Sequence, residues 1–115
     1  MTVIPLPQAK AELFRTLGHP VRIRVLELLL DGPKPVRDLL ADIEVEASNL
    51  SQQLAVLRRA DLVRSSRDGA LVVYALSSAE VAALLAAARG ILSEVRDDRD
   101  GLRAQLSDDV TVRRA

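Results

Sequence analysis

The residues best suited to chemistry lie on one face of a helix predicted over residues 46–60. This face combines short polar side chains with an alanine and an arginine, and it has no carboxylate: Ser48, Asn49, Ser51, Gln52, Ala55 and Arg59. Leu50, Leu54 and Leu57 recur on the opposite side, which can therefore pack in a core. In a DNA major groove, Asn and Gln pair with adenine, Ser donates or accepts, and Arg binds guanine or phosphate. The pattern predicts a DNA-reading helix. The alternative is a solvated face, which would usually carry Glu and Lys.

A basic β-hairpin is expected directly after this helix, over residues 63–76. Val, Leu and Tyr are enriched on its second arm, as in strands, and Asp68-Gly69 supplies the tight turn. Between residues 58 and 67 there are four arginines and one aspartate. A helix followed by a basic hairpin indicates a winged helix-turn-helix, in which the helix reads bases and the wing reaches the backbone or the minor groove.

Short helices must position these two elements. The 115 residues suffice for one ordinary domain, and an aromatic content of 2% requires a core of Leu, Val, Ala and Ile. Proline and glycine positions predict helices over 8–17, 20–30, 35–41 and 46–60, followed by a capped last helix that begins at residues 77–80 and runs to about 96. The predicted fold class is mainly α with a small β-hairpin, a homodimeric winged helix-turn-helix in the order α-α-α-α-β-β-α.

The predicted domain occupies residues 8–96. Residues 1–7 hold two prolines and are expected to form an extended, flexible arm. The charged residues 97–115 are expected to form a partly disordered tail, in which the helix frays and residues 107–115 are disordered.

The last helix carries a broad apolar stripe that exceeds what one intramolecular face of so small a domain needs. We therefore predict that it joins two copies of the chain together with the first helix, while packing inside one copy is the alternative. The predicted dimer interface contains Leu13, Leu17, Leu84, Leu85, Ala88, Ile91, Leu92 and Val95.

Composition excludes several classes of protein. Without cysteine the chain has no disulfide, zinc–thiolate site or thiol switch. No apolar run reaches the roughly 20 residues that span a bilayer, and the first seven residues lack a signal-peptide core, so a soluble cytoplasmic protein is expected. Sixteen basic and sixteen acidic residues give no net charge, so DNA binding would depend on a local basic patch and on base contacts.

Three motifs, in this order, resemble the ArsR/SmtB family of bacterial winged-helix transcriptional regulators. They are Leu17–Leu26, which begins LGHPVR, Ser48–Leu57 (SNLSQQLAVL), and Arg67-Asp68-Gly69 followed by Val73–Leu76. The resemblance covers about residues 9–96. It implies a homodimer joined through its terminal helices that binds an imperfect palindrome in a promoter and usually represses transcription. Many members release DNA when a metal ion binds.

The resemblance also implies site residues. The groove-reading positions fall on Ala47, Ser48, Ser51 and Gln52, beside Gln53, and the wing contacts fall on Arg67 and Gly69, with Arg64 added. Position 52 is commonly His in the family, so Gln52 changes the expected base preference. With the residues of the polar face, the predicted DNA-binding set is Ala47, Ser48, Asn49, Ser51, Gln52, Gln53, Arg59, Arg64, Arg67 and Gly69.

The family's metal sites do not carry over to this sequence. Pro35 and Arg37 stand where one site has thiolates, and the other site's positions read Ser78, Glu80, Ile91 and Glu94, without an imidazole. The single histidine, His19, is interpreted as a helix cap or a packing residue. We therefore predict no metal site and no cofactor.

The predicted function is sequence-specific DNA binding by a transcriptional regulator, most simply a repressor, whose signal does not enter through a Cys/His metal site. An enzyme is disfavoured, because there is no Cys nucleophile or Gly-rich phosphate loop, and Ser51 has no histidine near it. Two alternatives stay open. One is a winged-helix protein-interaction module that acts with a separate sensor protein. The other is a metal-responsive regulator that uses carboxylates and His19.

Overall fold

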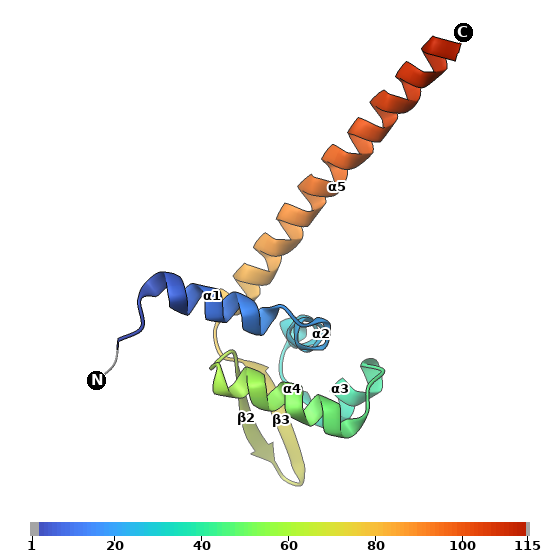
Figure 1. Cartoon of the computed structure of the whole chain (residues 1–115). Helices are drawn as coiled ribbons and strands as arrows, with labels where there is room; N and C mark the ends of the chain where they lie inside the picture. Colours follow the sequence, from blue (N-terminus) through green and yellow to red (C-terminus); the bar gives the residue numbers. More distant parts are fainter. Residues whose placement is uncertain (1–2, 115) are drawn as a thin grey trace. The chain divides into compact units, whose positions relative to one another are not determined.

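The computed structural model describes the backbone of residues 3–114 and the side chains of residues 3–102. The elements are α1 (Leu6–Leu17), α2 (Pro20–Leu28), the 3-10 turn η1 (Leu29–Asp31), β1 (Lys34–Pro35), α3 (Val36–Asp42), α4 (Ala47–Arg59), β2 (Val63–Asp68), β3 (Leu71–Leu76) and α5 (Ala79–Arg114) (Figure 1). This order confirms the predicted winged helix-turn-helix and adds one short strand. The chain divides into two units, Met1–Ala82 and Ala83–Ala115, which are described separately.

The core of the first unit is aliphatic, as the composition predicts. Its buried side chains come from every helix of the unit and from the hairpin: Leu17, Val25, Leu26, Leu29, Leu39, Ile43, Leu50, Leu54, Leu57, Leu62, Val63, Tyr74 and Val81. Leu50, Leu54 and Leu57 of α4 are at most 2% exposed. The packing side predicted for the reading helix is therefore confirmed, and it fixes which face of α4 meets solvent.

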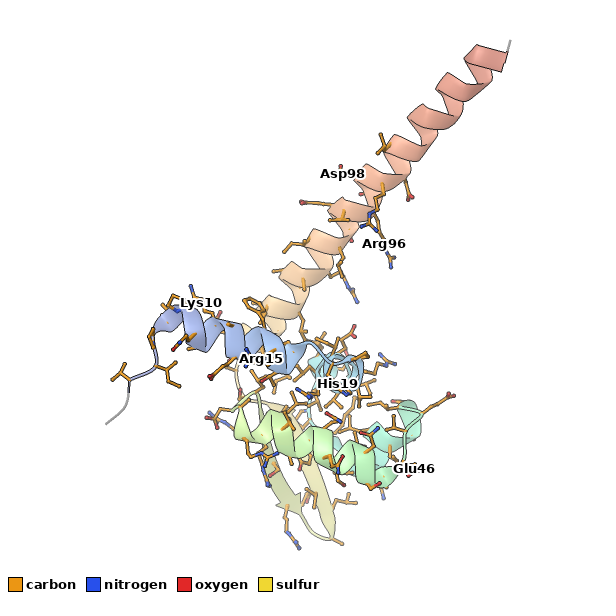
Figure 2. All side chains as sticks on the ribbon, in the orientation of Figure 1. Lys10, Arg15, His19, Glu46, Arg96 and Asp98 are labelled. Carbon is orange, nitrogen blue, oxygen red and sulfur yellow. The ribbon has the colours of Figure 1, made fainter. Side chains whose placement is uncertain are left out.

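The first two helices begin at residues that suit a helix start. α1 begins at Leu6 with Pro7 in its first turn, where the missing N–H of proline costs nothing, so the expected extended arm is shortened to residues 3–5 of the described chain. His19 caps α2, because its Nδ1 accepts a hydrogen bond from the Val21 N–H at 3.2 Å. Figure 2 shows His19 where α1 gives way to α2. One of the two roles interpreted for His19, that of a cap, is therefore confirmed.

The end of α4 turns the chain directly into the wing. The N–H of Asp61 donates to the Arg58 carbonyl and the N–H of Leu62 donates to the Leu57 carbonyl, both at 3.0 Å. These two bonds form a Schellman motif, in which the residue after the cap adopts a left-handed conformation. Here that residue is Asp61, with φ of 59°, where glycine is usual. β2 follows at Val63, and α4 and β2 pack against each other (Figure 1).

The wing belongs to a three-stranded antiparallel sheet in the order β1-β3-β2. β2 and β3 pair from Val63↔Leu76 to Asp68↔Leu71, and Gly69, with φ of 63°, lies in the turn between them, as predicted. β1 was not predicted. Its Lys34 and Pro35 pair with Tyr74 and Val73, so Pro35 lies in a strand and α3 begins one residue later than expected. A two-residue strand is too short to leave a periodic signal in the sequence.

In the second unit, α5 continues to Arg114, beyond the helix end expected near residue 96. The helical backbone thus includes most of the segment 107–115 that was expected to be disordered, and residue 115 lies outside the described residues. Residues 97–114 contain no proline that would end the helix, and Gly101 costs a helix only about 1 kcal/mol relative to alanine. Among the described residues, no helix combines the length and the apolar character that crossing a membrane requires.

Candidate nucleic-acid interface

The polar face of α4 is open to solvent. Ala47, Ser48, Ser51, Gln52 and Arg59 are exposed, whereas Asn49, Gln53 and Ala55 are half-buried. Glu46, also exposed, stands at the start of the helix (Figure 2). Because the leucines on the opposite side are buried, α4 can rotate little about its axis, and the exposed residues form a fixed surface. Groups of this kind on one accessible helix face can donate to and accept from base edges and phosphates.

Two residues of the predicted DNA-binding set, Asn49 and Gln53, form hydrogen bonds within the protein. Gln53 Oε1 accepts a hydrogen bond from Arg22 Nε at 2.8 Å, and Gln53 Nε2 donates to Asn49 Oδ1 at 3.0 Å. Arg22 Nη1 also donates to the Thr16 carbonyl at 2.9 Å. Both ends of the Gln53 amide are therefore occupied inside the protein, and the geometry gives no support to Gln53 as a direct DNA contact.

The sequence did not single out Arg22 as a functional residue. It belongs to the motif LGHPVR, but a single arginine in a predicted helix carries no periodic or spacing signal. Its partner Gln53 lies 31 positions further along the chain, so only the packing of α2 against α4 brings the two together.

The wing presents its two arginines on opposite faces. Arg64 and Arg67 are both exposed, and so is Gly69 in the turn. Side chains alternate along a strand, so Arg67 shares a face with the buried Val63, and Arg64 lies on the other face. Because β2 packs against α4, the face of Val63 is the one directed toward the helices. Arg67, close to the turn on that face, is therefore the better placed of the two to meet DNA together with α4.

The predicted dimer residues differ in how much surface they leave free. In α1, Leu17 is only 9% exposed and belongs to the core, Leu13 is half-buried, and Phe14, which was not in the predicted set, is 57% exposed. In α5, Leu84 and Leu85 are half-buried, and Ala88 is exposed. Ile91 and Leu92 are each 61% exposed, Val95 38% and Leu102 56%. Leu102 lies on the same helical face as Ile91 and was missed because the apolar stripe was expected to end at Val95.

The described residues hold no group of three or more His, Asp or Glu side chains placed to bind one metal ion. The Nδ1 atom of His19 is occupied by the cap of α2. Pro35, at a position where the family has a thiolate, is part of β1.

The comparisons with known proteins agree with this geometry. Residues 19–65 match the family described as bacterial regulatory protein, arsR family. The HTH-type transcriptional regulator Rv0081 of Mycobacterium tuberculosis is 51% identical over 96 residues, which cover 83% of this chain and 84% of that protein. Its crystal structure superposes with a TM-score of 0.79 at 50% identity, covering 84% of this chain and 98% of that one.

Two further solved structures share the fold. The transcriptional repressor BigR from Xylella fastidiosa has a TM-score of 0.69 at 35% identity, covering 74% of this chain and 87% of that one. The homodimeric winged helix-turn-helix DNA-binding domain of Mb0332 from Mycobacterium bovis has a TM-score of 0.71 at 23% identity. The match covers 82% of this chain and 92% of that one. Element order, reading-helix pattern and sequence identity lead to the same assignment: the chain belongs to the ArsR family of bacterial transcriptional regulators.

Proposed function

We propose that this regulator binds a palindromic promoter operator as a homodimer and represses transcription. In this proposal α4 enters the major groove of each half-site and the β2–β3 hairpin contacts the flanking backbone. The observation that carries the proposal is the exposed, carboxylate-free face of α4, formed by Ser48, Ser51, Gln52 and Arg59 above a buried leucine side. The name of BigR as a transcriptional repressor supports the direction of the effect.

Exposed apolar surface on α5 supports the homodimer. Ile91, Leu92 and Leu102 are each more than half exposed and follow one another along one helical face. Leaving such a stripe in water is unfavourable by about 25 cal/mol for each Å² of apolar surface, and a second copy of the same helix would cover it. The homodimeric state stated for Mb0332 is consistent with this arrangement.

We propose further that DNA binding needs no bound metal and that no signal enters through a Cys/His metal site, which leaves a small ligand, a separate sensor protein or constitutive binding. The donor set supports this, because the sequence has no cysteine and only one histidine. Tight transition-metal sites usually require several Cys or His ligands.

The test is a fluorescence anisotropy titration with DNA from upstream of the protein's own gene and with unrelated DNA of equal length, at one salt concentration. We expect the upstream DNA to bind at least about a thousandfold more tightly, as is usual for specific recognition. Adding a chelator should leave both curves unchanged. Equal binding of the two DNAs would favour the alternative, a protein-interaction module. The zero net charge of the chain is the observation that favours this alternative. Release of the upstream DNA on adding Zn²⁺ or Ni²⁺, or loss of binding on chelation, would favour the metal-responsive regulator.

A further inference from the structure

A chain of three hydrogen bonds joins α1, α2 and the reading helix. It runs from the Thr16 carbonyl to Arg22, from Arg22 to Gln53, and from Gln53 to Asn49. Two of its donors belong to the Arg22 guanidinium, at 2.8 Å and 2.9 Å from their acceptors, so the plane of that group is held at two points. Arg22 and Gln53 are both half-buried, which limits competition from water.

The arginine fixes the direction of every bond in this chain. A guanidinium can only donate, so Gln53 must present its oxygen to Arg22. The Gln53 nitrogen then points the other way and must donate, and Asn49 must accept with its oxygen. A chain made of amides alone could reverse, because an amide donates at one end and accepts at the other. With a donor-only group at its start, the chain has one favoured direction.

The end of the chain is the side chain of Asn49, on the flank of the exposed face of α4. Its Oδ1 is turned toward Gln53, and its Nδ2 has no acceptor among the described residues. A free asparagine can pair with both a donor and an acceptor of adenine, which needs its oxygen and its nitrogen together. Asn49, held in this way, offers DNA its N–H₂ group.

We propose that Arg22, acting through Gln53, is a positioning residue that makes Asn49 a hydrogen-bond donor toward DNA. α4 then selects an acceptor at this point, which is either a base-edge atom such as guanine O6 or thymine O4, or a phosphate oxygen. This inference rests on the proposed function, since it concerns DNA bound to α4. It assigns to Gln53 and Arg22 an indirect role in specificity in place of a direct contact.

Gln53→Glu is the decisive variant, because a carboxylate still accepts from Arg22 but cannot donate to Asn49. Asn49 must then turn its nitrogen inward and its oxygen toward DNA. We expect operator affinity to fall about threefold to tenfold per half-site, the usual range for one hydrogen bond. If the DNA partner is a base, the preference at one position of each half-site should change toward a donor-presenting base, adenine or cytosine. If it is a phosphate, all sequences should weaken equally.

The matched control repeats Gln53→Glu in an Asn49→Ala background, where no side chain is left to turn. The added negative charge is the same in both backgrounds, so the excess loss in the presence of Asn49 measures the reversal alone. An excess of at least about threefold supports the proposal. Equal losses in the two backgrounds, or no loss in either, would overturn it.

A second pair of variants, Arg22→Lys and Arg22→Met, tests the role of Arg22 in setting the direction of the chain. Lysine is also a donor-only group, so Arg22→Lys should retain the base preference, or the phosphate affinity, of the wild type. Arg22→Met removes the fixed direction and should weaken discrimination against donor-presenting bases. Melting curves for each variant identify a loss of folding, and the Gln53→Glu cycle does not depend on this pair.

One measurement needs no DNA. In the free protein, the Nε–H of Arg22 should exchange with solvent more slowly than that of the exposed Arg64. Equal exchange rates would show that the chain of bonds does not form and would overturn the proposal. If the wild-type protein binds upstream and unrelated DNA equally, the proposed function and this inference both fail. If the wild type prefers the upstream DNA but Gln53→Glu causes the same loss with and without Asn49, only the inference fails.

Discussion

The backbone N–H of Leu62 donates to the carbonyl oxygen of Leu57 at 3.0 Å, and both side chains are buried. This bond ends α4 and leads into the wing within one turn of chain, so the spacing between α4 and the hairpin depends on the three residues that connect them, 60–62. One of these is Asp61, whose φ of 59° is unfavourable for any side chain with a Cβ.

Asp61→Gly should therefore stabilise the protein. Glycine adopts this conformation without the steric cost, and we expect the free energy of unfolding to rise by roughly 1 kcal/mol. Urea denaturation measures the change. Asp61→Ala is the control, because it removes the same charge but keeps a Cβ, and it should bring no gain. If both variants gained equally, relief of the charge rather than of the backbone would be the cause.

His19→Ala should destabilise the first unit by about 0.5–2 kcal/mol, since it removes the acceptor for the Val21 N–H at the start of α2. Thermal unfolding measures the loss. His19→Ser replaces the imidazole by another capping acceptor and should recover most of the stability. A serine variant as unstable as the alanine variant would mean that His19 contributes by packing and not as a cap.

The reading helix should show its role through base preference. Gln52 is exposed in the middle of the polar face of α4. Gln52→Ala should weaken specific operator binding by about 1–3 kcal/mol and relax the preference at one position of each half-site. Selection from a randomised operator library measures the preference. Leu54→Ala is the comparison for a packing residue, because it should lower stability by about 2–5 kcal/mol along with binding. An unchanged preference in Gln52→Ala would remove Gln52 from the site.

The two faces of the wing should contribute differently to DNA binding. Arg67 lies on the face that is directed toward the helices, so Arg67→Ala should weaken all DNA sequences about equally and lower the salt dependence of binding by roughly one unit of slope per phosphate contact. Arg64→Ala removes the same charge from the opposite face and should have the smaller effect. Titrations of both variants at several salt concentrations compare the two. A larger effect for Arg64 would mean that the other face of the hairpin meets DNA.

The apolar stripe of α5 should hold the dimer together. Ile91 is 61% exposed in the single chain, and Ile91→Glu places a charge in the centre of the proposed interface. Sedimentation equilibrium should then report a monomer where the wild type is a dimer. Ser93 is also exposed and lies on the opposite side of the same helix, so Ser93→Glu should leave the dimer intact. A dimer that tolerates Ile91→Glu would place the interface elsewhere.

The parts of this fold that could be predicted are those with a local pattern. The spacing of Leu50, Leu54 and Leu57 predicts that α4 is a helix and which side of it is buried, and Asp68-Gly69 predicts the turn of the wing. Features that depend on tertiary contact could not be predicted. β1 exists only because Lys34 lies beside Tyr74, and a strand of two residues has no period of its own.

The candidate site likewise contains some features that the sequence predicts and others that depend on tertiary contacts. The polar face of α4 follows from the sequence because helical geometry alone assigns residues to faces. The bond between Arg22 and Gln53 spans 31 positions and depends on how α2 packs against α4, for which the sequence contains no rule. Leu17 and Phe14 show the same limit, since both suit the apolar side of α1, yet packing buries the first and exposes the second.

The order β1-β3-β2 leaves this small sheet with two edge strands, and each is poorly suited to pairing with a further chain. β1 has only two residues, and its Pro35 has no N–H to offer a neighbour. β2 carries Arg64 and Arg67, whose like charges disfavour a second copy of the same strand. The sheet therefore resists growth by strand addition and aggregation from its edges. The proposed dimer therefore uses helical surfaces, and the charged surface of the wing is not covered by a further strand.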